Sequence, residues 1–216
     1  GRAVITSSLS GPSIVLVNSN VTLDGLVVEF TTHGAGVRTD TSQSAENLVI
    51  RNCRFETATS DGYAIGFTSA NGSAGELHHV TIRISDCVLR GGTISGMGVI
   101  LGVDATSSVQ MYDCDSFAGA DAAFFGGHAS ADIKIFGGNY ESPTDGITAA
   151  DTTVVKVFFA RARGGGNGDL WNDGGTVLPY FCDARPDYSE NVTNFPTAAG
   201  LALLDDANAS AQRTTL

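Results

Sequence analysis

The stretch "IRISDCVL", at residues 82–89, carries the pattern that decides the fold of this chain. Its first and third residues, Ile82 and Ile84, are apolar and alternate with polar residues, as in a strand with one buried face. Asp86 follows at the fifth position, where a short polar residue tolerates a left-handed backbone and lets the chain bend. A cysteine and a leucine then return to the buried side. The stretch therefore predicts a strand, a bend and a second strand.

The same pattern recurs along the chain. Runs of this form begin at residues 21, 48, 82, 109, 133 and 155, so their spacing drifts between 22 and 34 residues. A turn and a third short strand follow after about ten more residues, which is typical of a solenoid coil. Helical repeats need runs with a 3.6-residue period, and we identify none before residue 200. An antiparallel sandwich also has regularly spaced short strands, but it does not predict a bend and an inward cysteine at one phase.

We therefore predict an all-β fold, a single-stranded, right-handed parallel β-helix of about six rungs. The rungs are expected over residues 14–163, in a domain that covers 1–163. Residues 164–199 are rich in glycine and aromatic residues and lose the rhythm, so we expect an irregular cap that covers the open strand edges or packs on a partner chain. Residues 200–216 are expected to form a separate segment with a short helix-like tail, capped by Asp205 or Asp206.

Three of the four cysteines, Cys53, Cys87 and Cys114, fall at the same phase of successive runs. In-register parallel strands lie about 4.8 Å apart, so these side chains should stack inside the coil. Their nearly parallel Cβ directions do not suit a disulfide, and a linear stack lacks the tetrahedral convergence of a thiolate metal site. We predict free, buried thiols, with no metal and no cofactor. Cys182 is interpreted as lying outside the repeat and as reduced.

The charge of the chain restricts its partners. Twelve Lys and Arg residues stand against 23 Asp and Glu residues, which gives a formal net charge of −11. Binding to nucleic acid requires clustered Lys and Arg to neutralise phosphates, so we predict no nucleic-acid partner. No stretch approaches about 18 consecutive apolar residues, so we predict no membrane insertion.

Five carboxylates are candidate catalytic groups for a sugar-cleaving β-helix. Asp61, Asp121 and Asp145 occupy matching positions before the third strand, and Glu29 and Glu56 should face solvent as a pair. Glycoside hydrolysis needs an acid and a base or nucleophile about 5–10 Å apart, and a lyase needs a base. The competing interpretation is that an Asp at such a turn caps its own backbone. No motif identifies a catalytic residue, so the sequence leaves open whether the chain is an enzyme.

Sugar binding without chemistry requires exposed aromatic rings beside hydrogen-bonding groups. The candidate platforms are Tyr63, Phe67, Trp171 and Tyr180. The alternative is that these rings are buried in loops or between subunits.

The last residues, "AGLALLDDANASAQRTTL" at 199–216, resemble a segment that recurs in bacteriophage tail fibre and tailspike proteins. The resemblance rests on Gly200, Leu201, Leu203, Leu204, Asp205, Asp206, Ala209, Ala211, Gln212, Arg213, Thr215 and Leu216. It implies an extracellular virion component, a trimer of parallel β-helices that contacts bacterial surface polysaccharide and in some cases cleaves it. The family usually continues with a Gly-Leu-Gly run, so we expect a piece of a longer protein.

The leucines of this segment also have no partners within it, which favours packing around a threefold axis in a homotrimer. The expected function is structural and host-attaching. The alternatives are a polysaccharide depolymerase on the same β-helix, either a glycoside hydrolase or a lyase, and a non-viral, secreted, pectin-lyase-like enzyme.

Overall fold

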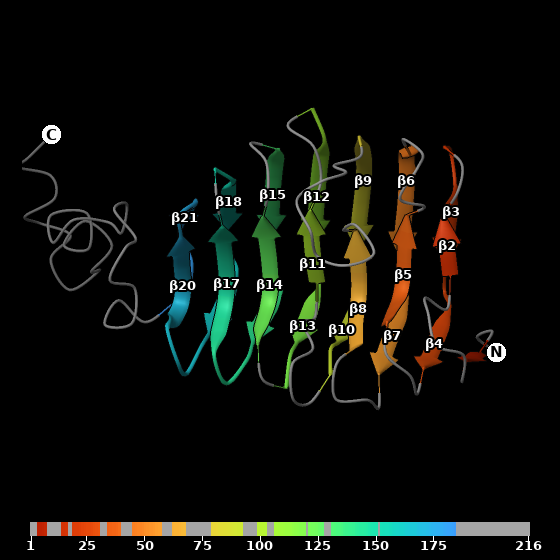
Figure 1. Cartoon of the computed structure of the whole chain (residues 1–216), viewed down its shortest axis with the longest axis horizontal. Coiled ribbons are helices and arrows are strands. Elements are labelled where there is room, and N and C mark those ends of the chain that lie inside the picture. The colour runs from red at the N-terminus through yellow and green to blue at the C-terminus, as the bar shows by residue number, and fades with distance from the viewer. Residues whose placement is uncertain are drawn as a thin grey trace, which may run out of the picture.

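The computed structural model describes residues 4–7, 14–16, 19–30, 34–39, 45–57, 62–67, 79–92, 99–102, 106–119, 121–127, 131–150 and 152–184. Every helix or strand assigned within these residues is a β-strand, and the 21 strands form three parallel sheets of seven strands each. The sheets run side by side along the length of the molecule (Figure 1). The predicted all-β parallel solenoid is confirmed.

Each coil contributes one strand to sheet A, one to sheet B and one to sheet C, in that order. Sheet A contains β1 (Val4–Ser7), β4 (Val27–Phe30), β7 (Arg54–Thr57), β10 (Val88–Arg90), β13 (Asp115–Phe117), β16 (Asn139–Glu141) and β19 (Arg161–Arg163). Sheet B contains β2 (Ile14–Leu16), β5 (Gly34–Thr39), β8 (Gly62–Phe67), β11 (Val99–Gly102), β14 (Ala122–Gly127), β17 (Asp145–Ala150) and β20 (Gly168–Asp173). Sheet C contains β3 (Thr22–Asp24), β6 (Ala45–Arg51), β9 (Val80–Ser85), β12 (Ser108–Tyr112), β15 (Asp132–Phe136), β18 (Val154–Phe158) and β21 (Thr176–Tyr180).

A left-handed residue follows the sheet C strand in every coil. The residues at this bend have φ between 47° and 69°, and they are Gly25, Asn52, Asp86, Asp113, Gly137, Phe159 and Phe181. Glycine, asparagine and aspartate adopt this backbone at little cost, as the sequence pattern predicts. The two phenylalanines adopt it as well, although a bulky side chain there is strained.

The interior is filled by alternate side chains from all three sheets. Its largest fully buried members include Phe30, Phe55, Phe124 and Tyr140. Phe124 and Tyr140 meet edge to face, with ring centroids 6.4 Å apart and an interplanar angle of 85°. Because interiors of this kind are close-packed, each coil fixes the position of the next and gives the outer faces a rigid support.

The cysteines are free thiols, as predicted, and Cys53, Cys87 and Cys114 are buried in successive coils. Backbone hydrogen bonds join these coils directly: Val88 donates to the Cys53 carbonyl at 3.0 Å, and Asp115 donates to the Cys87 carbonyl at 2.9 Å. Hydrogen bonding to Cys87 and burial together raise the pKa of the Cys53 thiol. Cys53 is therefore uncharged at neutral pH and packs as a small apolar side chain.

The coil extends beyond the predicted boundaries at both ends. Strand β1 precedes residue 14, while β20 and β21 lie in the region expected to be an irregular cap. Val177 of β21 is in register with Val155, and the Cys182 thiol donates to the Val157 carbonyl at 3.3 Å. The placement of Cys182 outside the repeat was therefore wrong. Pro179, at an inward strand position, obscured this seventh run in the sequence.

Residues from 185 onward lie outside the described residues. They include the predicted segment 200–216 with its helix-like tail and the last part of the predicted cap, residues 185–199. Within the part of the chain that the structure describes, no helix has the length and apolar character needed to cross a membrane.

Candidate carbohydrate-binding face

The outer face of sheet C gathers side chains in regular lines because neighbouring strands pair in register. In β12, β15 and β18 the second and fourth residues are buried and the others face outward. We call one outward line the central column; its in-register members are Thr22, Val49, Arg83, Gln110, Lys134, Lys156 and Leu178.

An aromatic ladder runs beside the central column, two residues further along each strand. It consists of Tyr112, Phe136, Phe158 and Tyr180, whose successive ring centroids lie 4.9, 4.9 and 4.6 Å apart with interplanar angles of 8–10°. Parallel strands repeat every 4.8 Å or so, which places equivalent rings at stacking distance. Each stacked pair contributes about 0.5–1.5 kcal/mol beyond its burial.

The two ends of the aromatic ladder differ. The Arg83 guanidinium lies 4.4 Å from the centroid of Tyr112 and covers that end through a cation–π contact. At the other end Tyr180 is 41% exposed, and its outer ring face has no aromatic or cationic partner among the described residues. Since the rings cover one another, the ladder presents mainly ring edges to solvent.

An exposed aromatic patch continues from this end of the ladder. Phe159 and Phe181 stack at the bend with centroids 5.6 Å apart, and they are 68% and 65% exposed. Their left-handed backbone costs about 1–2 kcal/mol for each residue. Exposed apolar side chains held in a strained backbone are unusual, and such patches commonly mark contact surfaces.

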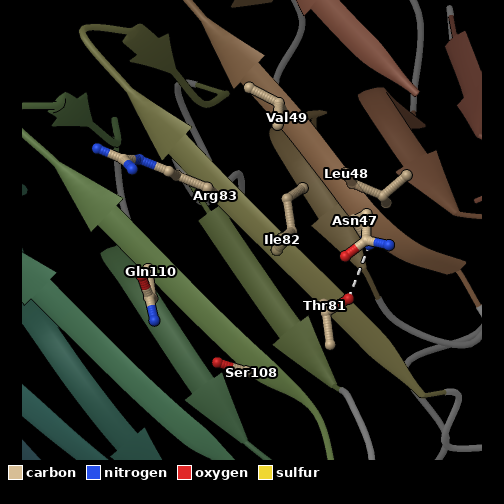
Figure 2. Close-up of a pocket in the computed structure, with 8 residues that line it drawn as sticks. All are labelled: Asn47, Leu48, Val49, Thr81, Ile82, Arg83, Ser108 and Gln110. Atoms are coloured by element: carbon tan, nitrogen blue, oxygen red, sulfur yellow. Dashed lines mark hydrogen bonds between the residues drawn. The ribbon is translucent and has the colours of Figure 1, made fainter. Parts of the chain in front are cut away.

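A shallow, open groove of about 280 Å³ crosses β6, β9 and β12 on the same face (Figure 2). It is lined by Asn47, Leu48, Val49, Thr81, Ile82, Arg83, Ser108 and Gln110. The Asn47 backbone amide donates to the Thr81 hydroxyl at 2.8 Å, which fixes one wall. The lining therefore offers amide, hydroxyl and guanidinium groups, with aliphatic carbon from Val49.

Gln110 and Arg83 connect the groove to the aromatic ladder. The Tyr112 hydroxyl donates to Gln110 Oε1 at 2.8 Å, so the Gln110 amide keeps its N–H groups as donors. Arg83 lines the groove and also stacks on Tyr112. The groove and the ladder therefore form one continuous surface.

Positive charge is in excess on this part of sheet C. Lys134 and Lys156 both approach Asp132, at 2.6 and 3.5 Å, and the hydrogen bond from Lys134 holds the Asp132 pKa below its usual value. Arg83 has no carboxylate partner among the described residues. The sheet C strands β9, β12, β15 and β18 thus carry three cations and one anion, in a chain whose formal net charge is −11.

The candidate pair Glu29 and Glu56 is brought together, but on sheet A. The two residues are register partners on β4 and β7, and Glu29 is exposed as predicted. Glu56 is half-buried and forms an ion pair with Arg54 on its own strand. This ion pair occupies Glu56, and neither carboxylate lines the groove.

The two candidate aspartates that the structure describes, Asp121 and Asp145, do not form a pair of accessible carboxylates. Asp121 accepts a hydrogen bond from the Ala122 amide at 3.0 Å, which is the turn-capping interpretation. Asp145 aligns with Ala122 instead of Asp121, is only 5% exposed and accepts a hydrogen bond from Asn167 at 3.3 Å. Burial raises the Asp145 pKa, and the Asp121 charge acts in the same direction. Asp61 lies outside the described residues.

The predicted aromatic platforms do not converge on one surface. Tyr63 and Trp171 are half-buried on β8 and β20 of sheet B, whereas Tyr180 ends the ladder on sheet C. Phe67 belongs to β8, but its side chain is not among those that the structure describes. Sequence reasoning missed the rest of the ladder, although its signal was present: an aromatic residue recurs at the fourth position of the runs beginning at 109, 133 and 155.

Metal binding finds no support in the described part of the chain, where no three His, Cys, Asp or Glu side chains are grouped to hold an ion. No protein-family model matches the chain, and neither a curated protein nor a solved structure does. The comparisons therefore assign no family to it.

Proposed function

We propose that this chain is a structural and host-attachment component of a phage tail fibre or tailspike, in which the outer face of sheet C binds bacterial surface polysaccharide. The parallel solenoid and the tail-fibre-like sequence at 199–216 support the fibre assignment. Such a component acts on the virion, outside the cell. We further propose that it is a homotrimer, because the leucines near the C-terminus need partners.

The observation that carries the binding proposal is the groove joined to the aromatic ladder. A polysaccharide presents many hydroxyl groups, which need both donors and acceptors, and the groove supplies both from Asn47, Thr81, Ser108 and Gln110. The close-packed interior holds this surface in place, so little conformational freedom is lost on binding.

Attachment fits the described residues better than cleavage. Hydrolysis needs two carboxyl groups on either side of one bond, and the groove lining contains neither Asp nor Glu. The neighbouring Glu29 and Glu56 are on sheet A, with Glu56 held by Arg54. The expected activity is therefore binding without depolymerisation.

The test is to titrate the full chain with capsular polysaccharide and lipopolysaccharide extracts and to analyse the mixtures for released oligosaccharides. We expect saturable binding without oligosaccharide release. The double variant Thr81→Val and Gln110→Ala should weaken binding at least tenfold, because it removes two polar contacts of the groove. As a matched control, Asn139→Ala removes a polar side chain from the outer face of sheet A and should leave binding unchanged.

Reproducible release of oligosaccharides would show that the chain is a depolymerase and would contradict binding without cleavage. If the groove variant and the parent chain bind polysaccharide equally well, sheet C is not the binding face. Light scattering of the full chain tests the assembly, and a clean monomer would contradict the homotrimer.

A further inference from the structure

Resting on the proposed polysaccharide-binding function, we infer that sheet C binds an anionic polysaccharide whose chain lies along the solenoid axis, over the central column. The column crosses β9, β12, β15 and β18, so a ligand that follows it runs from coil to coil.

The spacing of the charges favours a repeating ligand. Arg83 and Lys134 are separated by two strand spacings, about 10 Å, with the Gln110 amide between them. Lys134 and Lys156 together retain one surplus positive charge after Asp132 is counted. Two net positive charges therefore lie about two strands apart, a separation that suits two successive carboxylates in a polymer of disaccharide repeats.

The chemistry of the column suits carboxylates in particular. The Arg83 guanidinium is a planar fork that matches a carboxylate, and the lysines supply ammonium charges. The Gln110 amide, between Arg83 and Lys134 in the central column, adds neutral N–H donors. The neighbouring ladder presents ring edges, which are the electropositive part of an aromatic ring. Cations, amide donors and ring edges all favour a negatively charged ligand.

The outer surface of sheet A lacks this excess. Its strands carry equal numbers of charges of each sign: the four cations are Arg54, Arg90, Arg161 and Arg163, and the four anions are Glu29, Glu56, Asp115 and Glu141. A polyanion approaching a chain of net charge −11 is repelled over most of the surface, so local surplus charge decides where it binds.

Affinity electrophoresis of the full chain tests this inference. Native gels would contain polygalacturonate, the same polymer fully methyl-esterified, neutral dextran, or single-stranded poly(dT). We expect polygalacturonate to bind at least tenfold more tightly than its ester, with the difference shrinking as salt rises. Arg83→Gln with Lys156→Gln should weaken that binding about tenfold while leaving the Lys134–Asp132 ion pair in place.

The matched control is Arg90→Gln with Arg161→Gln, which makes the same charge change on sheet A and should leave the affinity unchanged. Equal binding of acid and ester, or preferred binding of dextran, would overturn the anionic ligand while leaving polysaccharide attachment intact. Equal losses of polygalacturonate affinity in both double variants would show an effect of net charge alone. That result would overturn the central column as the binding site. Binding of poly(dT) as tight as that of polygalacturonate would indicate a nucleic-acid surface instead.

Failure of every probe would also overturn the inference. Attachment itself is decided separately, by the titration with bacterial extracts.

Discussion

Sheets A and C are built by the same coils, yet their outer faces carry different chemistry. On sheet A each line of outward residues mixes signs: one line contains Arg54, Asp115 and Arg161, and the other contains Glu56, Arg90, Glu141 and Arg163. On sheet C the central column is cationic or amide from Arg83 to Lys156, and the neighbouring line is aromatic from Tyr112 to Tyr180. In-register pairing aligns equivalent positions of successive coils. A line of side chains is therefore uniform only where the same residue type recurs at that position in the sequence.

This difference separates the interactions that stabilise the solenoid from those that give the outer face of sheet C its own chemistry. The interior is shared by both sheets, and exposed ion pairs such as those on sheet A contribute only about 0–1 kcal/mol each. The ladder on sheet C adds stacking between coils, and the central column adds surplus charge. Substitutions in the interior should therefore lower the free energy of unfolding, whereas substitutions in the central column should lower the affinity for the ligand.

The largest effect is expected from Phe55→Ala, beneath sheet A. Phe55 is fully buried, so its truncation leaves a cavity and should lower the free energy of unfolding by about 3–5 kcal/mol. Chemical denaturation measures this loss. The fraction that remains folded should bind polysaccharide normally, because the groove lies on sheet C; reduced affinity of the folded fraction would show that the faces are coupled.

A smaller effect is expected from Phe158→Ala in the ladder. Phe158 stacks on both Phe136 and Tyr180, so its loss should lower unfolding stability by about 1–3 kcal/mol. Phe117→Ala on sheet A is the matched control. Phe117 has one cation–π partner, Arg90 at 5.4 Å, and its truncation should cost less than about 1 kcal/mol. Similar losses for the two variants in thermal denaturation would show that the ladder adds no stability.

A substitution in the exposed aromatic patch of Phe159 and Phe181 should change the free energy of unfolding very little. Phe159→Asn relieves an unfavourable left-handed backbone but removes the contact with Phe181, two effects of about 1 kcal/mol each. We therefore expect a change in unfolding stability of less than about 1 kcal/mol by denaturant titration. A loss above about 2 kcal/mol would mean that Phe159 is a structural residue and not part of an exposed contact surface.

The smallest effect concerns Asp145, which belongs to neither face. Its folded-state pKa is raised by burial, so the folded chain holds this proton more tightly than the unfolded chain does. Stability is then lost as pH rises from the unfolded pKa through the folded pKa. Asp145→Asn should stabilise the chain at pH 7 by less than about 1 kcal/mol, and the gain should vanish near pH 3. A gain that is unchanged at low pH would exclude ionisation as its cause.

Much of this architecture could be predicted from the sequence, because alternation and a recurring bend are local signals. The stack of Cys53, Cys87 and Cys114 followed directly from their common phase. The seventh run was missed because Pro179 and Phe181 replace the residue types that the pattern led us to expect. The aromatic ladder was missed for a different reason: single rings were judged one at a time, whereas the ladder exists only through register between distant strands.

The candidate carboxylates show a further limit of the sequence. Asp121 and Asp145 have matching positions in the sequence repeat, yet a shift of one residue in pairing separates their surroundings. One lies at a half-buried turn and the other is buried, and such differences depend on register and packing that local patterns do not specify.

The central claim is that the outer face of sheet C is the ligand-binding face of this solenoid. The most direct test is a crystal structure of the full chain with a bound oligogalacturonate. We expect density for the sugar across β9, β12, β15 and β18, with carboxylates within hydrogen-bonding distance of Arg83 and Lys134. A sugar bound on sheet A, or one lying across the coils without contact to the central column, would contradict it.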